Sequence, residues 1–237
     1  MTLKDDLIAK IDEYAASQWD DIPNGYVVPT PQSLTFGNTG IRIDATVLYA
    51  DINGSTDMVD ALRDTLAAEY YKAYLHCAAK IIKNTGGDIT AYDGDRVMAI
   101  YVGNEQCKNA VDSALQLNWA LKFLINPIFA RVYGKYHRPI SHTIGIDCGK
   151  LLAAKTGVRV ESDLVWVGPA ANYASKLNSF KGLDPLYQIR ITEFVMTKNS
   201  ISALTRALDG KSIWDGPYND LSKRGKHYRT DCHMAFD

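Results

Sequence analysis

Residues 41–52 read IRIDATVLYADI, a run of apolar and β-branched side chains that predicts a buried strand. Asn53-Gly54 follows this strand and is typical of a turn. Ser55 or Thr56 is then placed to cap a long helix, which we expect to continue to about residue 84. The core therefore opens with a strand, a tight turn and a helix.

The rest of the chain continues with the same kinds of element. Gly86-Gly87 ends the first long helix, and residues 89–102 predict two strands joined by a tight turn at Asp93-Gly94. A second long helix is expected from about residue 104 to 132, with Pro127 kinking or breaking it. The remaining expected elements are strands at 140–156 and 163–168, a helix at 169–179, a strand near 188–191 and a polar tail. This order favours an α+β fold of the split-βαβ, ferredoxin-like type.

The N-terminal part differs in pattern from this core. Residues 3–17 carry apolar side chains at helical spacing and predict a short amphipathic helix: Leu3, Leu7, Ile8, Ile11 and Tyr14. Residues 20–40 hold three prolines, three glycines and no periodicity, which indicates a linker. We therefore expect a helix in 1–19, a linker in 20–40 and a core domain in 41–237.

The composition excludes several classes of protein. Of 237 residues, 46% are hydrophobic and 22% are charged, which is typical of a soluble globular chain and not of a disordered one. The 26 basic and 27 acidic residues leave a net charge of −1, so we expect no nucleic-acid partner and no membrane partner. The N-terminus is charged and has no apolar signal segment, which predicts a cytoplasmic protein. The four cysteines are far apart in sequence and are expected to be reduced thiols: Cys77, Cys107, Cys148 and Cys232.

Two acids stand at places where chemistry is expected. Asp51 ends the first strand just before a helix, and Asp95 lies at the turn of the hairpin. In a split-βαβ fold the first strand lies beside this hairpin, so both carboxylates are expected at one edge of the sheet. Two carboxylates near a helix N-terminus suit Mg²⁺ or Mn²⁺ bound to a triphosphate. The residues alone also allow a simpler interpretation, in which Asp51 caps a turn and Asp95 is an ordinary hairpin residue.

Four segments resemble the signatures of the class III nucleotidyl cyclases. LYADINGST (48–56) is similar to F-x-D-I-x-G-F-T, YDGDRVM (92–98) to the second metal motif, GIDCG (145–149) to G-I-x-x-G, and VGPAANYASK (167–176) to V-G-x-x-V-N-x-A-S-R. They occur in the order and spacing of that family, within residues 43–180. The N-terminal helix and linker lie outside the resemblance.

The resemblance implies a head-to-tail homodimer with active sites at its interface. Asp51 and Asp95 would bind two divalent cations, Mn²⁺ or Mg²⁺, with the carbonyl of Ile52 as a further ligand. Asn172 of the other protomer would orient the ribose. Lys176 stands where the family normally has an Arg that steadies the negative charge developing on the α-phosphate. Lys keeps the positive charge of this Arg but lacks its planar guanidinium fork. The alternative for Asn172 and Lys176 is a helix cap and a solvated charge.

A basic run near the C-terminus is a second candidate for phosphate binding. KRGKHYR (223–229) packs four cationic side chains into seven residues. Cyclases of this class place a phosphate-binding Lys in a similar turn, and either Lys223 or Lys226 would take this role here. The run is equally consistent with a solvated face.

The base-binding positions depart from those of purine cyclases. The position that holds Lys or Glu in adenylyl or guanylyl cyclases is Ala91, and the position that holds Asp, Thr or Cys is Val165. Neither side chain can hydrogen-bond to a purine. Arg96 follows the second metal aspartate, and Tyr49 replaces the more usual Phe beside the first. An Arg with five donors matches the two carbonyl acceptors of uracil, so UTP is expected as substrate, with CTP second.

This combination resembles the pyrimidine cyclases of bacterial Pycsar anti-phage systems. The resemblance implies conversion of UTP to 3′,5′-cyclic UMP and pyrophosphate, with the product activating a separate effector that is not bound directly. One alternative is an adenylyl or guanylyl cyclase that reads its base through other contacts. Another is a catalytically silent nucleotide-binding module, which Lys176 and the missing purine contacts would suggest. Retention of Asp51, Asp95 and Asn172 argues against the silent module.

Overall fold

The computed structural model describes residues 2–19, 21–179, 186–198, 200–206, 208–219 and 224–236. The strands are β1 (Asn24–Gly25), β2 (Ile41–Ile52), β3 (Asp88–Asp93), β4 (Arg96–Tyr101), β5 (His142–Gly157), β6 (Ser162–Val167), β7 (Ile189–Thr192), β8 (Asp215–Tyr218) and β9 (His227–Thr230). The helices are α1 (Leu3–Ala16), α2 (Ser55–Ala61), α3 (Asp64–Asn84), α4 (Gln106–Ala120), α5 (Asn126–Tyr133), α6 (Pro169–Asn178) and α7 (Glu193–Met196). A π-helical segment at Leu121–Ile125 joins α4 to α5, and short 3-10 segments lie at Gly134–Tyr136 and Ile201–Ala203.

These strands form one sheet in the order β3-β4-β2-β5-β7-β9-β8. β2 is antiparallel to both β4 and β5, whereas β5 and β7 run parallel. β6 folds back on the second half of β5, and β1 pairs with β2. The α+β arrangement expected from the sequence is confirmed, with the β3–β4 hairpin directly beside β2.

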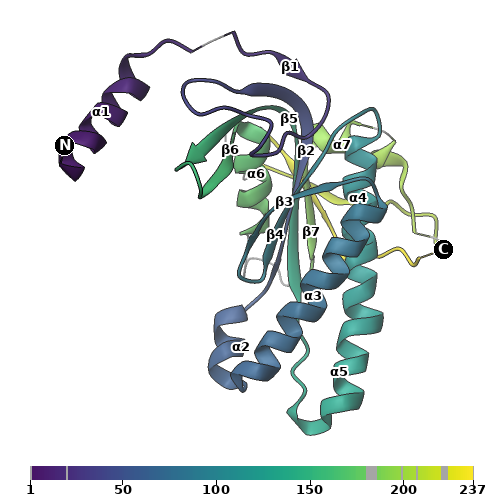
Figure 1. The fold of residues 1–237 in the computed structure, drawn as a ribbon. Coiled ribbons are helices and arrows are strands. Elements are labelled where there is room, and N and C mark those ends of the chain that lie inside the picture. The colour runs from purple at the N-terminus through teal and green to yellow at the C-terminus, as the bar shows by residue number, and fades with distance from the viewer. Residues whose placement is uncertain are drawn as a thin grey trace.

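Helices cover both faces of the central strands. Leu48, Ala50 and Ile52 of β2 join the core under α3 and α4, while Ile43 and Val47 face α6. Figure 1 shows α3, α4 and α5 gathered together, with α6 set apart from them next to β5 and β6. Because β2 is buried on both faces, its sequence is almost continuously apolar.

A glycine allows α6 to lie very close to the sheet. A Cβ atom at Gly145 of β5 would lie 2.2 Å from the carbonyl oxygen of Ala174 on α6. Such a contact is impossible for any other residue without moving the helix. The GIDCG segment therefore sets the distance between α6 and the strands that it covers.

The long helix expected after β2 is two helices, so that expectation is wrong. α2 ends at Ala61, Leu62 is extended with φ −113° and ψ 163°, and α3 begins at Asp64. The expected cap at Ser55 or Thr56 is also wrong, because Gly54 occupies the N-cap with φ 65° and no side chain caps the helix. The turn needs a left-handed residue at this point, which glycine adopts without a Cβ clash.

The kink or break expected at Pro127 takes the form of a change in helix type, because the backbone stays right-handed helical through Ile125 and Asn126. α4 passes into the π-helical segment Leu121–Ile125, and Pro127 then lies in the first turn of α5. The Asn126 N–H donates to the carbonyl of Leu121, five residues earlier, and this wider turn leads into the proline, which has no N–H to donate. The Asn126 amide also donates to the carbonyl of Ile140 and accepts from its N–H, each at 2.9 Å, which ties the helix to the return loop.

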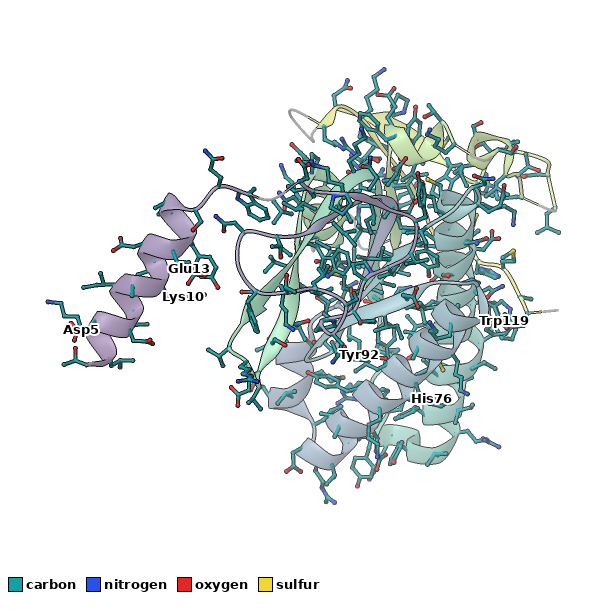
Figure 2. All side chains as sticks on the ribbon, turned by 45° about the horizontal axis from the view of Figure 1, so that its top comes forward. Asp5, Lys10, Glu13, His76, Tyr92 and Trp119 are labelled. Atoms are coloured by element: carbon teal, nitrogen blue, oxygen red, sulfur yellow. The ribbon has the colours of Figure 1, made fainter. Side chains whose placement is uncertain are left out.

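The N-terminal helix forms as expected and stands away from the sheet. None of the residues of α1 is buried, and Figures 1 and 2 show it at the end of an extended segment. The Asn38 amide donates to the carbonyls of Tyr14 and Ser17, at 3.0 and 2.7 Å, and so holds its C-terminal end. The segment expected as a linker contains β1 and the buried Leu34.

The expectation of a polar tail at the C-terminus is wrong. β9 pairs with β7 in antiparallel register, and β8 extends the sheet beyond it. These strands have four residues each, too few to show a periodicity in sequence. The four cysteines are free thiols, and no helix among the described residues is both long and apolar enough to cross a membrane.

Candidate active site

The structure brings Asp51, Ile52 and Asp95 together at one end of β2. Asp51 is buried, with 3% of its surface exposed. Asp95 lies in the turn of the β3–β4 hairpin, and its carboxylate accepts a hydrogen bond from the Ile52 N–H at 3.1 Å. The sequence placed both acids at one edge of the sheet, and the geometry agrees with that placement.

The two carboxylates repel each other at this site. Burial raises the pKa of Asp95, and the nearby Asp51 carboxylate raises it further. A divalent cation between two such groups relieves this repulsion, and hard cations prefer oxygen ligands. Among the described residues, no group of three or more His, Cys, Asp or Glu side chains is placed to hold a metal ion, so a centre here would rely on these two acids and main-chain oxygen.

Arg96 and Tyr49 lie on the same face of the sheet as Asp51. The Arg96 Nη2 atom is 3.2 Å from Oδ2 of Asp51, which makes a cross-strand ion pair between β4 and β2. Burial raises the pKa of the Tyr49 hydroxyl, and the positive charge of Arg96 opposes that effect. The expected base-binding pair therefore adjoins the expected metal ligands.

A set of hydrogen bonds that the sequence did not indicate fixes the turn after Ile52. The Asn53 N–H donates to the carbonyl of Ser141 at 2.9 Å, and its side-chain amide donates to the Ser141 hydroxyl at 3.2 Å. The Thr143 hydroxyl donates to Oδ1 of Asn53 at 2.6 Å, and the buried Asn178 of α6 donates to the carbonyl of Thr143 at 2.6 Å. The only signal in the sequence was the Asn-Gly pair, which predicts a turn and not its partners.

Behind this turn lies a buried chain of polar side chains. The Tyr74 hydroxyl of α3 is 3.1 Å from Nδ1 of His142, and Nε2 of His142 is 3.3 Å from Oδ1 of Asn118 on α4. The Asn118 amide donates to the carbonyls of Asp231 and Cys232, at 2.9 and 2.8 Å. The chain connects the strand beside Ile52 to the C-terminal segment.

The hydrogen-bond pattern defines the protonation of His142. Because the Asn118 nitrogen donates to two carbonyls, its Oδ1 must accept, and Nε2 of His142 must carry the proton. Nδ1 is then the acceptor for the Tyr74 hydroxyl. Complete burial lowers the pKa of His142 to about 3, so the ring is neutral in the folded protein.

Asn172 and Lys176 lie elsewhere in the protomer, on the exposed face of α6. They are one helical turn apart, and the Lys176 amine lies 5.7 Å from the centre of the Tyr173 ring. Among the described residues, neither side chain contacts Asp51 or Asp95. Their participation in the site therefore requires a second protomer and stays a prediction.

Ala91 and Val165 are exposed on two strands that are not neighbours in the sheet. Ala91 belongs to β3 and Val165 to β6, and β4, β2 and β5 separate these strands. Their expected role in base binding therefore stays a prediction, as that of Asn172 does.

The basic run near the C-terminus divides into structural and exposed cations. Arg224 forms an ion pair with the buried Asp147 at 2.7 Å and stacks at 3.9 Å on the ring of Phe194. Arg229 pairs with Asp215 at 2.9 Å. The Lys226 amine lies 3.8 Å from Glu193, and its side chain is 44% exposed. Lys223, the other expected phosphate ligand, lies outside the described residues.

The chain is similar to proteins named uridylate cyclase. It is 43% identical to the uridylate cyclase of Xanthomonas perforans over 237 residues, which is 100% of both chains. It is 38% identical to that of Burkholderia cepacia over 216 residues, covering 90% of this chain and 91% of the relative. The chain belongs to the uridylate cyclase family. No protein-family model matches it.

Solved structures show the fold of this uridylate cyclase family member. The adenylyl cyclase CyaB from P. aeruginosa superposes with a TM-score of 0.67 and 22% identity, covering 81% of this chain and 95% of the other. The catalytic fold of class III cyclases is thereby confirmed for this chain.

The neutral His142 predicts how stability depends on pH. Its folded-state pKa of about 3 lies below the ordinary histidine value of 6.5, so only the unfolded chain takes up a proton between these pH values. The contribution of His142 to the free energy of unfolding is therefore complete above pH 6.5 and declines as the pH falls towards 3. We expect a loss of up to ~1.4 kcal/mol per pH unit.

Urea unfolding at pH 7, 6, 5 and 4 measures this loss. The matched variant His142→Gln keeps a donor and an acceptor but cannot titrate. Its stability should be lower at pH 7 and should fall less steeply than that of the parent. Parallel pH profiles for the two proteins would contradict the assignment.

Proposed function

We propose that this uridylate cyclase family member converts UTP to 3′,5′-cyclic UMP and pyrophosphate. The observation that carries the proposal is the buried Asp51 with the half-buried Asp95 next to it and Arg96 beside them. The carboxylates suit divalent cations on a triphosphate, and the guanidinium suits the carbonyl edge of a small base. The names of the relatives support the same substrate.

Asp51, Asp95 and the carbonyl of Ile52 would hold two divalent cations, Mn²⁺ or Mg²⁺. When bound, these cations activate the ribose 3′-hydroxyl and neutralise charge on the leaving pyrophosphate. The chain holds both acids in place for this task, because Asp51 is buried and the Asp95 carboxylate accepts a hydrogen bond from the Ile52 N–H. The Asn53 turn fixes their backbone through its bonds to Ser141 and Thr143.

The remaining groups come from a second protomer in this proposal. Asn172 would orient the ribose, and Lys176 would face the α-phosphate as charge develops on it. Both side chains are exposed on α6, as a surface that meets a partner requires. Of the two candidate phosphate ligands near the C-terminus, Lys226 lies within the described residues, and its partly exposed side chain would bind the β- and γ-phosphates of the triphosphate.

Arg96 would select the base, with the ring of Tyr49 as a wall. The guanidinium donates and cannot accept, so it matches O2 and O4 of uracil. Cytosine presents an amino group in place of O4, which makes CTP a weaker substrate. Ala91 and Val165 offer a purine no hydrogen bond. The cyclic nucleotide would act on a separate effector in a cytoplasmic anti-phage response, as in the systems that the sequence resembles.

The metal ligands give the first test. With Mn²⁺ and each of the four triphosphates, the parent should yield cyclic UMP and pyrophosphate, identified by mass spectrometry. Asp51→Asn and Asp95→Asn should each abolish turnover, because each removes a charged metal ligand without making a cavity. Circular dichroism should match the parent. An active Asp95→Asn enzyme would refute the metal assignment, and a chain with no product from any triphosphate would be the silent module.

A mixing experiment tests the shared site. If the acids and Asn172 come from different protomers, inactive Asp51→Asn and Asn172→Ala chains should complement each other. Random mixing gives about half heterodimers with one intact site of two, so roughly a quarter of parental activity should return. Lack of recovery after verified subunit exchange would exclude a shared site.

Base selection by Arg96 is tested by Arg96→Ala. The change should lower kcat/KM for UTP by ~1.5–3 kcal/mol, the range of a hydrogen bond from a charged group. Any residual activity on ATP should fall much less, because adenine lacks the two carbonyls. Steady-state kinetics on UTP and ATP measure the two changes in kcat/KM. Equal losses on both substrates would mean that Arg96 contacts the phosphates or supports the structure instead.

A further inference from the structure

Arg96 already occupies one of the oxygens that a cation is expected to use. Its Nη2 atom lies 3.2 Å from Oδ2 of Asp51, and the two side chains are 31% and 5% exposed. A charge-assisted contact with so buried a carboxylate is stronger than one at an open surface. A cation and the guanidinium therefore compete for Asp51.

The guanidinium is incompletely satisfied in this position. Its Nε atom is buried and has no hydrogen-bond partner among the described residues. A buried donor without an acceptor costs free energy that a second arrangement can recover. Arg96 also follows Asp95 directly, so its backbone stays at the site whichever partner its side chain contacts. The proximity of its charge to Tyr49 supports an alternative position on the base-binding side.

We propose that Arg96 alternates between Asp51 and a carbonyl of the pyrimidine base, and thereby couples cation binding to base binding. A cation that takes Asp51 releases Arg96 to the base, and a base that engages Arg96 leaves Asp51 to the cation. This inference rests on the proposed function. Neither role alone requires the coupling, because a residue that only reads the base would leave the cation affinity unchanged.

The coupling is reciprocal in its thermodynamics. If a cation strengthens base binding by some factor, the base strengthens cation binding by the same factor. Exchange of one charged contact for another is expected to give a factor of about five or more. Uridine is the suitable probe, because it carries the base and ribose without phosphates that would bind Mn²⁺ themselves.

The first measurement is Mn²⁺ binding without nucleotide, by isothermal titration calorimetry on the full chain. Arg96→Met removes the competing charge and keeps an unbranched side chain. It should bind Mn²⁺ several-fold more tightly than the parent. Arg131→Met on the exposed surface of α5 makes the same change in net charge and should bind like the parent. Equal or weaker binding by Arg96→Met would overturn the proposal.

The second measurement is uridine binding with and without saturating Mn²⁺, again by isothermal titration calorimetry. In the parent and in Arg131→Met, Mn²⁺ should strengthen uridine binding several-fold, and in Arg96→Met the factor should fall to about one. Arg96→Gln, which keeps donors but no charge, should behave like Arg96→Met. Coupling that survives in both Arg96 variants would overturn the inference.

The Asp51→Asn and Asp95→Asn chains separate this inference from the function beneath it. If both bind Mn²⁺ as the parent does, the metal site is wrong and the proposed function fails with it. If both lose Mn²⁺ binding while Arg96→Met binds Mn²⁺ with the affinity of the parent, the proposed function stands and only the coupling is overturned.

Discussion

Asp51 is a carboxylate at the end of a strand whose two faces are both covered, and the surrounding structure compensates for its burial. An isolated buried charge is costly, so such a group needs a partner or a cation. Arg96 supplies a partner of opposite charge from the neighbouring strand. Asp95, held by the N–H of Ile52, adds a second negative charge at the same point. The site thus holds two carboxylates against one guanidinium, and a bound cation would change the interactions among these three charges.

The geometry of this end of β2 depends on support from behind the sheet. His142 lies opposite Ile52 in the register of β5 and β2. It is held by Tyr74 from α3 and by Asn118 from α4, with every polar atom of the ring satisfied. Fully connected buried networks make a core more specific, whereas a single missing partner is expensive. The Asn118 bonds extend this support to the C-terminal segment at Asp231.

The protomer holds two separate groups of candidate residues. The acids and Arg96 lie at the end of β2, while Asn172 and Lys176 lie on the exposed face of α6. Gly145 lets α6 lie close to β5, and Asn178 of the same helix donates to the carbonyl of Thr143 beside the turn that follows Ile52. One helix therefore supports the turn beside Asp51 with its buried face and leaves Asn172 and Lys176 exposed on the other.

The sequence by itself determined the elements whose signals are local. The apolar run of 41–52, the Asn-Gly turn and the hairpin at Gly94 follow from side-chain alternation and turn chemistry, which act over a few residues. Once the fold class was expected, the adjacency of β2 and the hairpin placed Asp51 and Asp95 together. The family motifs had the same local character, since each spans about ten residues or fewer.

Only the tertiary structure decided which partner each polar side chain has. Arg224 and Lys226 look alike in the basic run, yet Arg224 pairs with a buried acid 77 positions away while Lys226 stays partly exposed. His142 showed no ligand spacing, and its neutral state exists because two helices and a strand enclose it. Such contacts depend on distant segments meeting, and burial then sets the charge of each group, so no local pattern predicts them.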